Sequence, residues 1–284
     1  MTWVPMASYE LSPLASFLEA HEEKGLNASA LLFQGKSRPQ WPPSRTARFW
    51  KIEDSQGKIR GVITLRNQTT LIPILPGPGP WPNFPLPIPP GKHFSLLGPW
   101  EWTSVLAQMI PGQPYKFMEY LLMTGPNLPR DPGNLPEEWE IHPANPQDRD
   151  LLFPLQAAYE KEEVVFSPEE FEPWACYHNL KILLEKEKVW YIQDGEFRPK
   201  AKGGTNAQGK HWSQLGGIYT DPPFRRQGIS RVLVQTMVND LLESGHRSSL
   251  FVKKHNVPAM NLYTSLGFES LGTFIISYYC LIKT

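Results

Sequence analysis

The sequence predicts a mixed α/β protein built from two domains. Its 284 residues are enough for two domains of ordinary size, and 40% of them are hydrophobic, including ten tryptophans, which supports packed cores. Strand-like and helix-like patterns also alternate along both halves of the chain, as in α/β folds. We expect one unit over residues 1–138 and a second over residues 139–284, joined by the Pro- and Gly-rich run 125–136.

The first half is expected to contain a helix, a hairpin, a strand, a helix and a strand. Ser12 and Pro13 supply an N-cap and a first-turn proline for a helix over 12–20. The turn at residues 54–57 joins two strands into a hairpin. The expected strands cover 30–33, 48–53, 61–66, 71–75, 94–97 and 115–123, and the second helix covers 100–110.

A proline-rich segment interrupts this half between Pro73 and Gly91. Proline cannot donate to a sheet or continue a helix, so the segment is predicted to be an extended loop. It is either a ligand for a proline-recognising partner or a loop that wraps its own domain. The second reading is favoured because Trp81, Phe84 and Ile88 are apolar enough to pack.

The second half is expected to begin with two helices. The first covers 148–161, and a capping box at residues 167–170 predicts the start of the second, which continues to 186. Asp194-Gly195 predicts a hairpin of strands 189–193 and 196–200, followed by a loop over 203–209. The remaining expected elements are strands 215–220, 249–252 and 273–281, a long helix from 229 to 242, and a short helix over 258–266.

The turn between strand 215–220 and the long helix is predicted to bind an anion. The first N–H groups of a helix lack intrahelical partners and carry partial positive charge. Gly228 allows close approach to the backbone, and Arg225 and Arg226 add charge, so the expected ligand is a phosphate or pyrophosphate. Gly245 follows the last apolar position of the helix and suits a left-handed C-cap.

The motif at this turn is neither a Walker loop nor a G-x-G-x-x-G dinucleotide fingerprint. The run 225–230, RRQGIS, resembles the [QR]-x-x-G-x-[GA] loop with which GNAT acyltransferases hold the pyrophosphate of acetyl-CoA, with Ser230 at the last position. The run 256–268, N-x-x-A-x-x-L-Y-x-x-L-G-F, resembles a second conserved region of the same superfamily. The resemblance covers residues 140 to 284, about half of the chain, and the first half has the element order of a degenerate copy without the arginine–glycine loop.

The resemblance implies a GNAT acyl-CoA N-acyltransferase fold and an acetyl-CoA site between two splayed strands. Gly216 and Gly217 fit a strand that bulges there. Ile218, Tyr219 and Thr220 would face the acyl and pantetheine portion, and Asn256 would bind pantetheine. The pyrophosphate would be held by Arg225, Arg226, Gln227, Gly228, Ile229 and Ser230.

The resemblance also implies transfer of an acetyl group to an amine. Tyr263 aligns with the general acid beside the CoA sulfur, and Glu163, next to Glu162, is the expected base. Each of these assignments has an alternative. Tyr263 also suits a core position, and Asn256 also suits a helix cap. The glutamate pair 162–163 and the arginine pair 225–226 also suit a solvated surface. Weaker base candidates are His178, His211 and Asp221, and an apolar acceptor pocket is suggested by Tyr159, Phe166, Phe171, Trp174 and Trp190, each of which also suits the core.

Composition excludes several other classes. The formal net charge of +0 argues against nucleic acid, and no apolar run approaches the ~20 residues of a membrane span. Cys176 and Cys280 have no spacing for zinc or a disulfide framework, so no metal is expected. The N-terminus lacks a secretory pattern, which favours a cytoplasmic protein, and the sequence leaves monomer and homodimer open. A non-catalytic acyl-CoA sensor and a proline-loop scaffold are the rival functions.

Overall fold

The computed structural model describes residues 2–7, 10–40, 47–79, 81–88, 91–165 and 167–281. The first half of the chain holds two helices, a run of strands, a third helix and a last strand. These are β1 Val4–Pro5, α1 Leu11–Ala20, α2 Glu22–Phe33, β2 Ala47–Glu53, β3 Ile59–Arg66, β4 Thr70–Ile74, β5 His93–Pro99, α3 Trp100–Ala107 and β6 Lys116–Thr124.

The second half repeats this order with one additional helix. Its elements are β7 Glu140–Pro143, α4 Arg149–Tyr159, α5 Pro173–Lys186, β8 Val189–Gln193, β9 Pro199–Gln208, β10 Trp212–Thr220, α6 Ile229–Glu243, β11 Arg247–Lys253, α7 Val257–Ser265 and β12 Glu269–Cys280. A π-helical turn, Glu160–Val164, extends α4. The additional helix is α6, and the proline-rich loop between β4 and β5 occupies its place in the first half.

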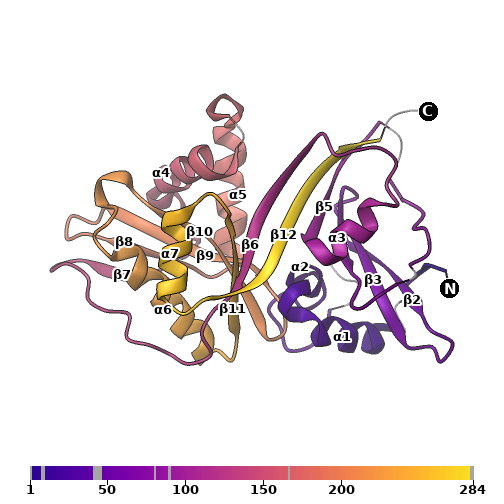
Figure 1. Ribbon diagram of the computed structural model, residues 1–284. Coiled ribbons are helices and arrows are strands. Elements are labelled where there is room, and N and C mark those ends of the chain that lie inside the picture. The colour runs from indigo at the N-terminus through magenta and orange to yellow at the C-terminus, as the bar shows by residue number, and fades with distance from the viewer. Residues whose placement is uncertain are drawn as a thin grey trace.

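All of these strands join one sheet of mixed direction. Its twelve strands run in the order β1-β2-β3-β4-β5-β12-β6-β11-β10-β9-β8-β7. Strand β12, from the end of the chain, pairs with β5, while β6, from the first half, pairs with β11. Each half therefore supplies the strand that completes the other half's sheet, and Figure 1 shows β6 and β12 side by side at the centre of the molecule.

This exchange bears on the predicted division of the chain. The units 1–138 and 139–284 remain an interpretation of the order of elements along the chain. Strand β6, from the first unit, pairs with a strand of the second, and β12, from the second unit, pairs with a strand of the first. Within the described ranges, no helix combines the length and the apolar character needed to cross a bilayer.

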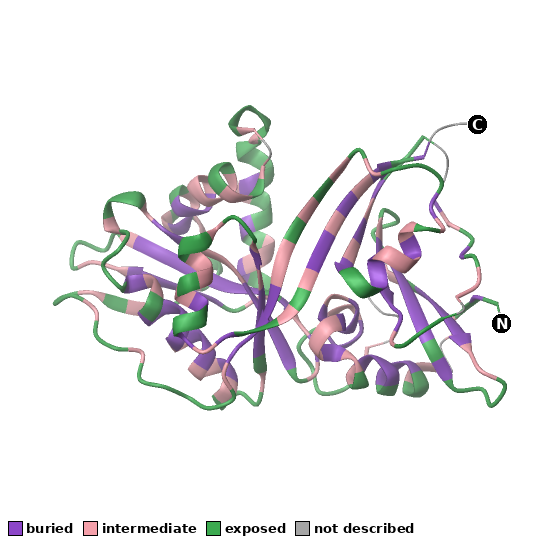
Figure 2. Cartoon of the chain, viewed as in Figure 1, coloured by how far each residue is buried: buried purple, intermediate pink, exposed green. Residues whose placement is uncertain are grey.

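Helices cover both faces of the second half's sheet. Alternate residues of β8 contribute to two separate apolar clusters: Trp190 and Ile192 pack with α6, whereas Val189 and Tyr191 pack with α4 and α5. The predicted apolar stripe of α6 is confirmed, because its positions are all buried: Ile229, Leu233, Met237 and Leu241. Figure 2 shows that burial is concentrated on the strands and on the sheet-facing sides of the helices.

The proline-rich loop packs on its own half of the protein. Phe84 and Ile88 are each 4% exposed and belong to the apolar core of that half. Phe84 makes edge contacts with Trp3 and Trp50, and the Trp3 indole Nε1 donates to the carbonyl of Pro82 at 2.9 Å. Residues 80, 89 and 90 lie outside the described residues. The reading of an ordered loop that wraps its own domain is confirmed for the described part.

Two predictions of local structure in the first half were wrong. Residues 30–33 are the last turn of α2 and not a strand, because Leu26, Ser29 and Leu32 continue one buried helical face. Helix α1 begins at Leu11 with Glu10 at the N-cap, so Ser12 lies inside the helix and caps nothing.

Two predictions in the second half were also wrong. The segment after Ser167 forms only a 3-10 turn, Pro168–Glu170, and α5 begins at Pro173. Proline has no N–H and clashes with the preceding turn, so it starts a helix more readily than it continues one. Residues 203–208 belong to β9 and not to a loop, because pairing with both β8 and β10 outweighs the low strand propensity of glycine.

Candidate active site

The central strands β10 and β11 separate part of the way along their length. They pair in parallel only from Trp212 to Leu215, opposite Arg247 to Leu250. On its other side, β10 has a register shift against β9 between Gly216 and Tyr219, and Gly217 has φ +61°. The predicted bulge at the paired glycines is confirmed, and the strands leave a wedge beyond it.

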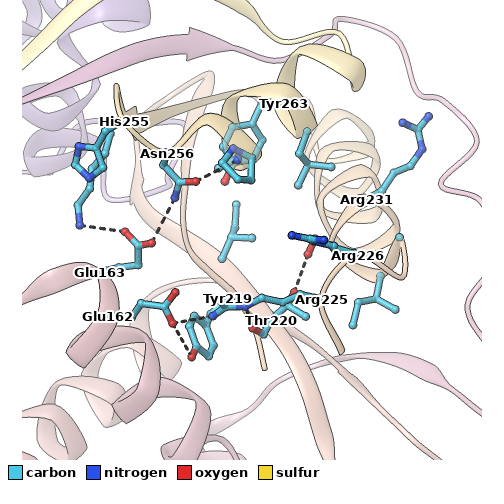
Figure 3. Close-up of a pocket in the computed structure, with 18 residues that line it drawn as sticks. Glu162, Glu163, Tyr219, Thr220, Arg225, Arg226, Arg231, His255, Asn256 and Tyr263 are labelled. Carbon is cyan, nitrogen blue, oxygen red and sulfur yellow. Dashed lines mark hydrogen bonds and ion pairs between the residues drawn. The ribbon is translucent and has the colours of Figure 1, made fainter. Parts of the chain in front are cut away.

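This wedge opens into a cavity of about 760 Å³ (Figure 3). The second half supplies its walls from the π-helical turn, the end of β10, the start of α6, the end of β11 and helix α7. The lining residues are Glu162, Glu163, Ile218, Tyr219, Thr220, Arg225, Arg226, Gly228, Ile229, Ser230, Arg231, Lys253, His255, Asn256, Pro258, Ala259, Leu262 and Tyr263. All of the predicted site residues except Gln227 therefore lie on one cavity.

The loop between β10 and α6 presents free backbone N–H groups. Arg226 and Gly228 adopt left-handed conformations, with φ +63° and +80°, and Gly228 is the N-cap of α6. Among the described residues, no acceptor bonds the N–H groups of residues 226 to 230, and no side chain caps the helix. A Cβ built on Gly228 would meet nothing within 4 Å. The arrangement is a cradle for an anion at a positive helix end.

The two arginines of this loop have different surroundings. Arg225 donates through Nη2 to Glu162 at 2.7 Å and through Nε to the carbonyl of Thr220 at 3.0 Å. It therefore ties the loop to the π-helical turn, and its hydrogen bond holds the pKa of Glu162 below its usual value. Arg226 is exposed on the cavity and has no ion-pair partner among the described residues. Arg226 is the arginine whose charge is available to an incoming anion.

Ser230 uses its hydroxyl within the protein. Its Oγ lies 2.7 Å from Oγ1 of Thr220, which joins the first turn of α6 to the end of β10. This bond gives a physical reason for serine where the family motif has glycine or alanine. Gln227 does not line the cavity, because its amide donates to the carbonyl of Pro223 at 3.2 Å.

The opposite wall carries a tyrosine and a glutamate. Tyr263 is 8% exposed, and burial, followed by the charges of Tyr159 and Glu163, raises the pKa of its hydroxyl. That hydroxyl has no hydrogen-bond partner among the described residues, so it is available to a ligand. Glu163 accepts from Lys253 Nζ at 3.0 Å and from Asn256 Nδ2 at 3.4 Å (Figure 3).

Asn256 also has the helix-capping role that was its alternative reading. Its Oδ1 accepts from the N–H of Ala259 at 3.2 Å and caps α7. The same side chain therefore orders the helix that carries Tyr263 and holds the carboxylate of Glu163.

Of the other predicted candidates that the structure describes, none lines the cavity. None of the weaker bases lines it, and His211 Nε2 is instead 2.8 Å from Glu19 in the first half. Trp190 is a core residue that donates to Asp240, Trp174 is 77% exposed, and neither Tyr159 nor Phe171 lines the cavity. Phe166 lies outside the described residues.

Sequence reasoning missed several lining residues. Lys253 is the last residue of β11 and His255 lies two residues further on, so both could have been found from their position before the second motif. Leu262 on α7 belongs to the second motif but had no predicted role in the site. Arg231 on α6 gives no signal of its own, because it lies at an exposed position of that helix.

Comparison with known proteins found a matching protein family and a similar enzyme. Residues 206–275 match the FR47-like protein family. Mycothiol acetyltransferase from Thermobifida fusca (strain YX) is 30% identical over 108 residues, covering 32% of this chain and 33% of that protein. The chain thus spans about a third of the curated relative that it matches.

Similar solved structures cover nearly the whole chain. The X-ray structure of a Drosophila protein superimposes with a TM-score of 0.69 at 11% identity over 98% of both chains. A tandem GNAT protein from the clavulanic acid biosynthesis pathway gives 0.57 at 10% identity over 99% of both chains. A GNAT-family acetyltransferase from Colwellia psychrerythraea gives 0.51 at 14% identity, covering 98% of this chain and 99% of that one. At these identities the likeness establishes the fold, and the predicted arrangement of two such units in tandem is confirmed.

Proposed function

Since the C-terminal half belongs to the GNAT superfamily and the whole chain has its tandem fold, we propose that the protein is an N-acetyltransferase that uses acetyl-CoA. The observation that carries the proposal is the row of unbonded N–H groups at residues 226–230, located where β10 and β11 separate. A pyrophosphate would accept from these groups, and the pantetheine arm would lie in the wedge. Arg226 would add a positive charge at the cavity mouth.

The transfer would proceed by direct attack in a ternary complex. The acceptor nitrogen loses a proton and attacks the thioester carbon, and the tetrahedral intermediate collapses by breaking the carbon–sulfur bond. Tyr263 would donate its proton to the leaving thiolate, because a phenol kept neutral by burial remains a proton source at pH 7. Glu163 would attract the amine and accept its proton, with Lys253 and Asn256 fixing the carboxylate.

We assign the chemistry to residues 139–284 and a covering role on the acceptor side to residues 1–138. Strand β6 of the first half supports this assignment, because it pairs with β11, whose last residue lines the cavity. Burial, then the charges of Tyr278 and Glu163, raises the pKa of Tyr120 on that strand to about 12. The first half is therefore within electrostatic reach of the proposed base.

The test is release of free thiol from acetyl-CoA in the presence of a panel of amines, amino acids and lysine peptides. Acceptor-dependent release that is lost in Tyr263→Phe supports the proposal. Tyr279→Phe is the matched control, since Tyr279 is a buried tyrosine, 3% exposed, in the core of the other half. Acetyl-CoA binding without turnover on any acceptor would refute the proposed acetyltransferase activity and indicate a non-catalytic acyl-CoA-binding module.

A further inference from the structure

A lysine without an ion pair lies buried beneath the bulge of β10. Lys202 on β9 is 1% exposed, and among the described residues its ammonium forms no ion pair. The other buried lysines differ: Lys200 pairs with Asp194 at 2.7 Å, and Lys51 pairs with Glu10 and Glu53. An unpaired buried ammonium is costly, so its surroundings are informative about function.

The ammonium of Lys202 is bonded to the bulge itself. The ladder passes from Gly216 opposite Gly204 to Tyr219 opposite Lys202, so Gly217 and Ile218 together stand across from Gly203 alone. Lys202 Nζ donates to the carbonyl of Gly217 at 3.0 Å. The lysine therefore contacts the carbonyl of a bulge residue that has no partner in the register of β10 and β9.

The same peptide group joins Gly217 to a residue that lines the cavity. The carbonyl of Gly217 and the N–H of Ile218 belong to one trans peptide, so they point in opposite directions. The carbonyl points to the ammonium of Lys202, on the face of the sheet that α4 and α5 cover, so the N–H points away from that ammonium. Pairing of β10 with β11 has already ended at Leu215. Ile218 lines the cavity and takes part in neither ladder.

We propose that Lys202 is a positioning residue that polarises the Gly217–Ile218 peptide, making the Ile218 N–H a strong hydrogen-bond donor to the acyl carbonyl oxygen. The inference rests on the proposed acetyl transfer. Hydrogen bonds in a chain strengthen one another in a low-dielectric interior. A donor fixed before the reaction also stabilises the negative charge that develops on that oxygen.

The surroundings of Lys202 allow its ammonium to lose its proton at moderately alkaline pH. The groups that face it are the ring of Tyr159 at 4.9 Å, Glu160 of the π-helical turn and the thiol of Cys176 on α5. Burial lowers the pKa of Lys202 to about 8, while burial raises the pKa of Cys176 to about 12. Lys202 is therefore mostly charged at pH 7 and neutral well above pH 9, with the thiol neutral throughout.

The first test follows the Ile218 amide by NMR in the full chain labelled with 15N-isoleucine, without any ligand. We expect its amide resonance to titrate with a midpoint near pH 8. The titration should vanish in Lys202→Met and in Lys202→Arg, and the arginine variant should keep the position of the charged state. Lys200→Met is the matched control, a buried lysine on the same strand whose variant should retain the titration. An unchanged titration in Lys202→Met would overturn the inference.

The second test is kinetic. Lys202→Met should bind CoA, which lacks the acyl group, within about twofold of the parent and lose roughly tenfold in kcat, because a donor is weakened and not removed. The loss should shrink toward none above pH 9. Equal kcat at pH 7 would refute the inference and leave the acetyltransferase proposal standing. Absence of turnover in the parent itself would refute the proposed function, and the amide titration would still decide the role of Lys202.

Discussion

Replacement of Gly228 by glutamate tests the anion cradle most directly. The residue is the N-cap of α6 at φ +80°, and its missing Cβ leaves open space on the cavity. A glutamate side chain would enter the volume proposed for the pyrophosphate. It would bring a negative charge to the place where the N–H groups of residues 226–230 are free.

The expected effect on binding follows from the charge. Two unit charges about 4 Å apart repel by roughly 4 kcal/mol at an effective dielectric constant of about 20. Every 1.4 kcal/mol is tenfold in affinity, so, allowing for screening by salt, we expect the Kd of CoA to rise at least about 100-fold. The left-handed backbone adds a folding cost of about 1–2 kcal/mol.

Isothermal calorimetry with CoA measures the first effect, and thermal unfolding measures the second. Gly245→Glu is the matched control, because Gly245 follows the other end of α6 at φ +77° with nothing within 4 Å of a Cβ. It lies about 20 Å from the cavity along a helix that rises 1.5 Å per residue. The control should lose similar stability and keep its affinity for CoA. Parental affinity in Gly228→Glu would refute the assignment of this loop.

Further predictions concern the opposite wall, the ion pair at the mouth and the proline-rich loop. Tyr263→Phe should reduce kcat by roughly 100-fold, the usual contribution of a general acid, and keep the Kd of acetyl-CoA within about twofold of the parent value. Undiminished turnover would show that the tyrosine is not the general acid. Glu162→Gln should lower the unfolding free energy at pH 7 by less than about 1 kcal/mol, because its pair with Arg225 is partly exposed. Since that hydrogen bond depresses the pKa of Glu162, its stabilisation is complete above the unfolded pKa of about 4.3 and is lost as the pH falls through the lower folded pKa. The difference in urea unfolding should therefore shrink as the pH falls below that unfolded pKa, and a difference that does not shrink would contradict this. Phe84→Ala should cost about 3–5 kcal/mol in the same unfolding assay and leave CoA affinity unchanged, as expected for a core side chain; a loss below about 1 kcal/mol would show that the loop does not hold its domain together.

Much of the site could be predicted because its parts are local. The turn from β10 into α6 depends on Gly228, the free N–H groups and a continuous apolar stripe, all within one stretch of sequence. The α7 motif likewise places Asn256 and Tyr263 on one short helix. Helix ends and strand-to-helix turns are specified by neighbouring residues, so their chemistry can be recognised without the fold.

Errors arose where distant partners decide the conformation. The glycines at 203 and 204 predict a loop, yet they lie in β9 because β8 and β10 pair with it on both sides. The alanine- and leucine-rich end of α2 suits either a helix or a short strand in isolation, and the helix forms because its buried face packs on the sheet.

The sequence by itself determined the class of fold, the two repeats and most of the predicted residues that meet at the cavity, because periodicity, glycine conformation and helix capping act over a few residues. Only the tertiary structure decided that β6 and β12 exchange places between the halves, and that Lys202 lies beneath the bulge against a single carbonyl. Both depend on pairing between segments far apart in the chain, and such pairing is set by the packing of the whole sheet.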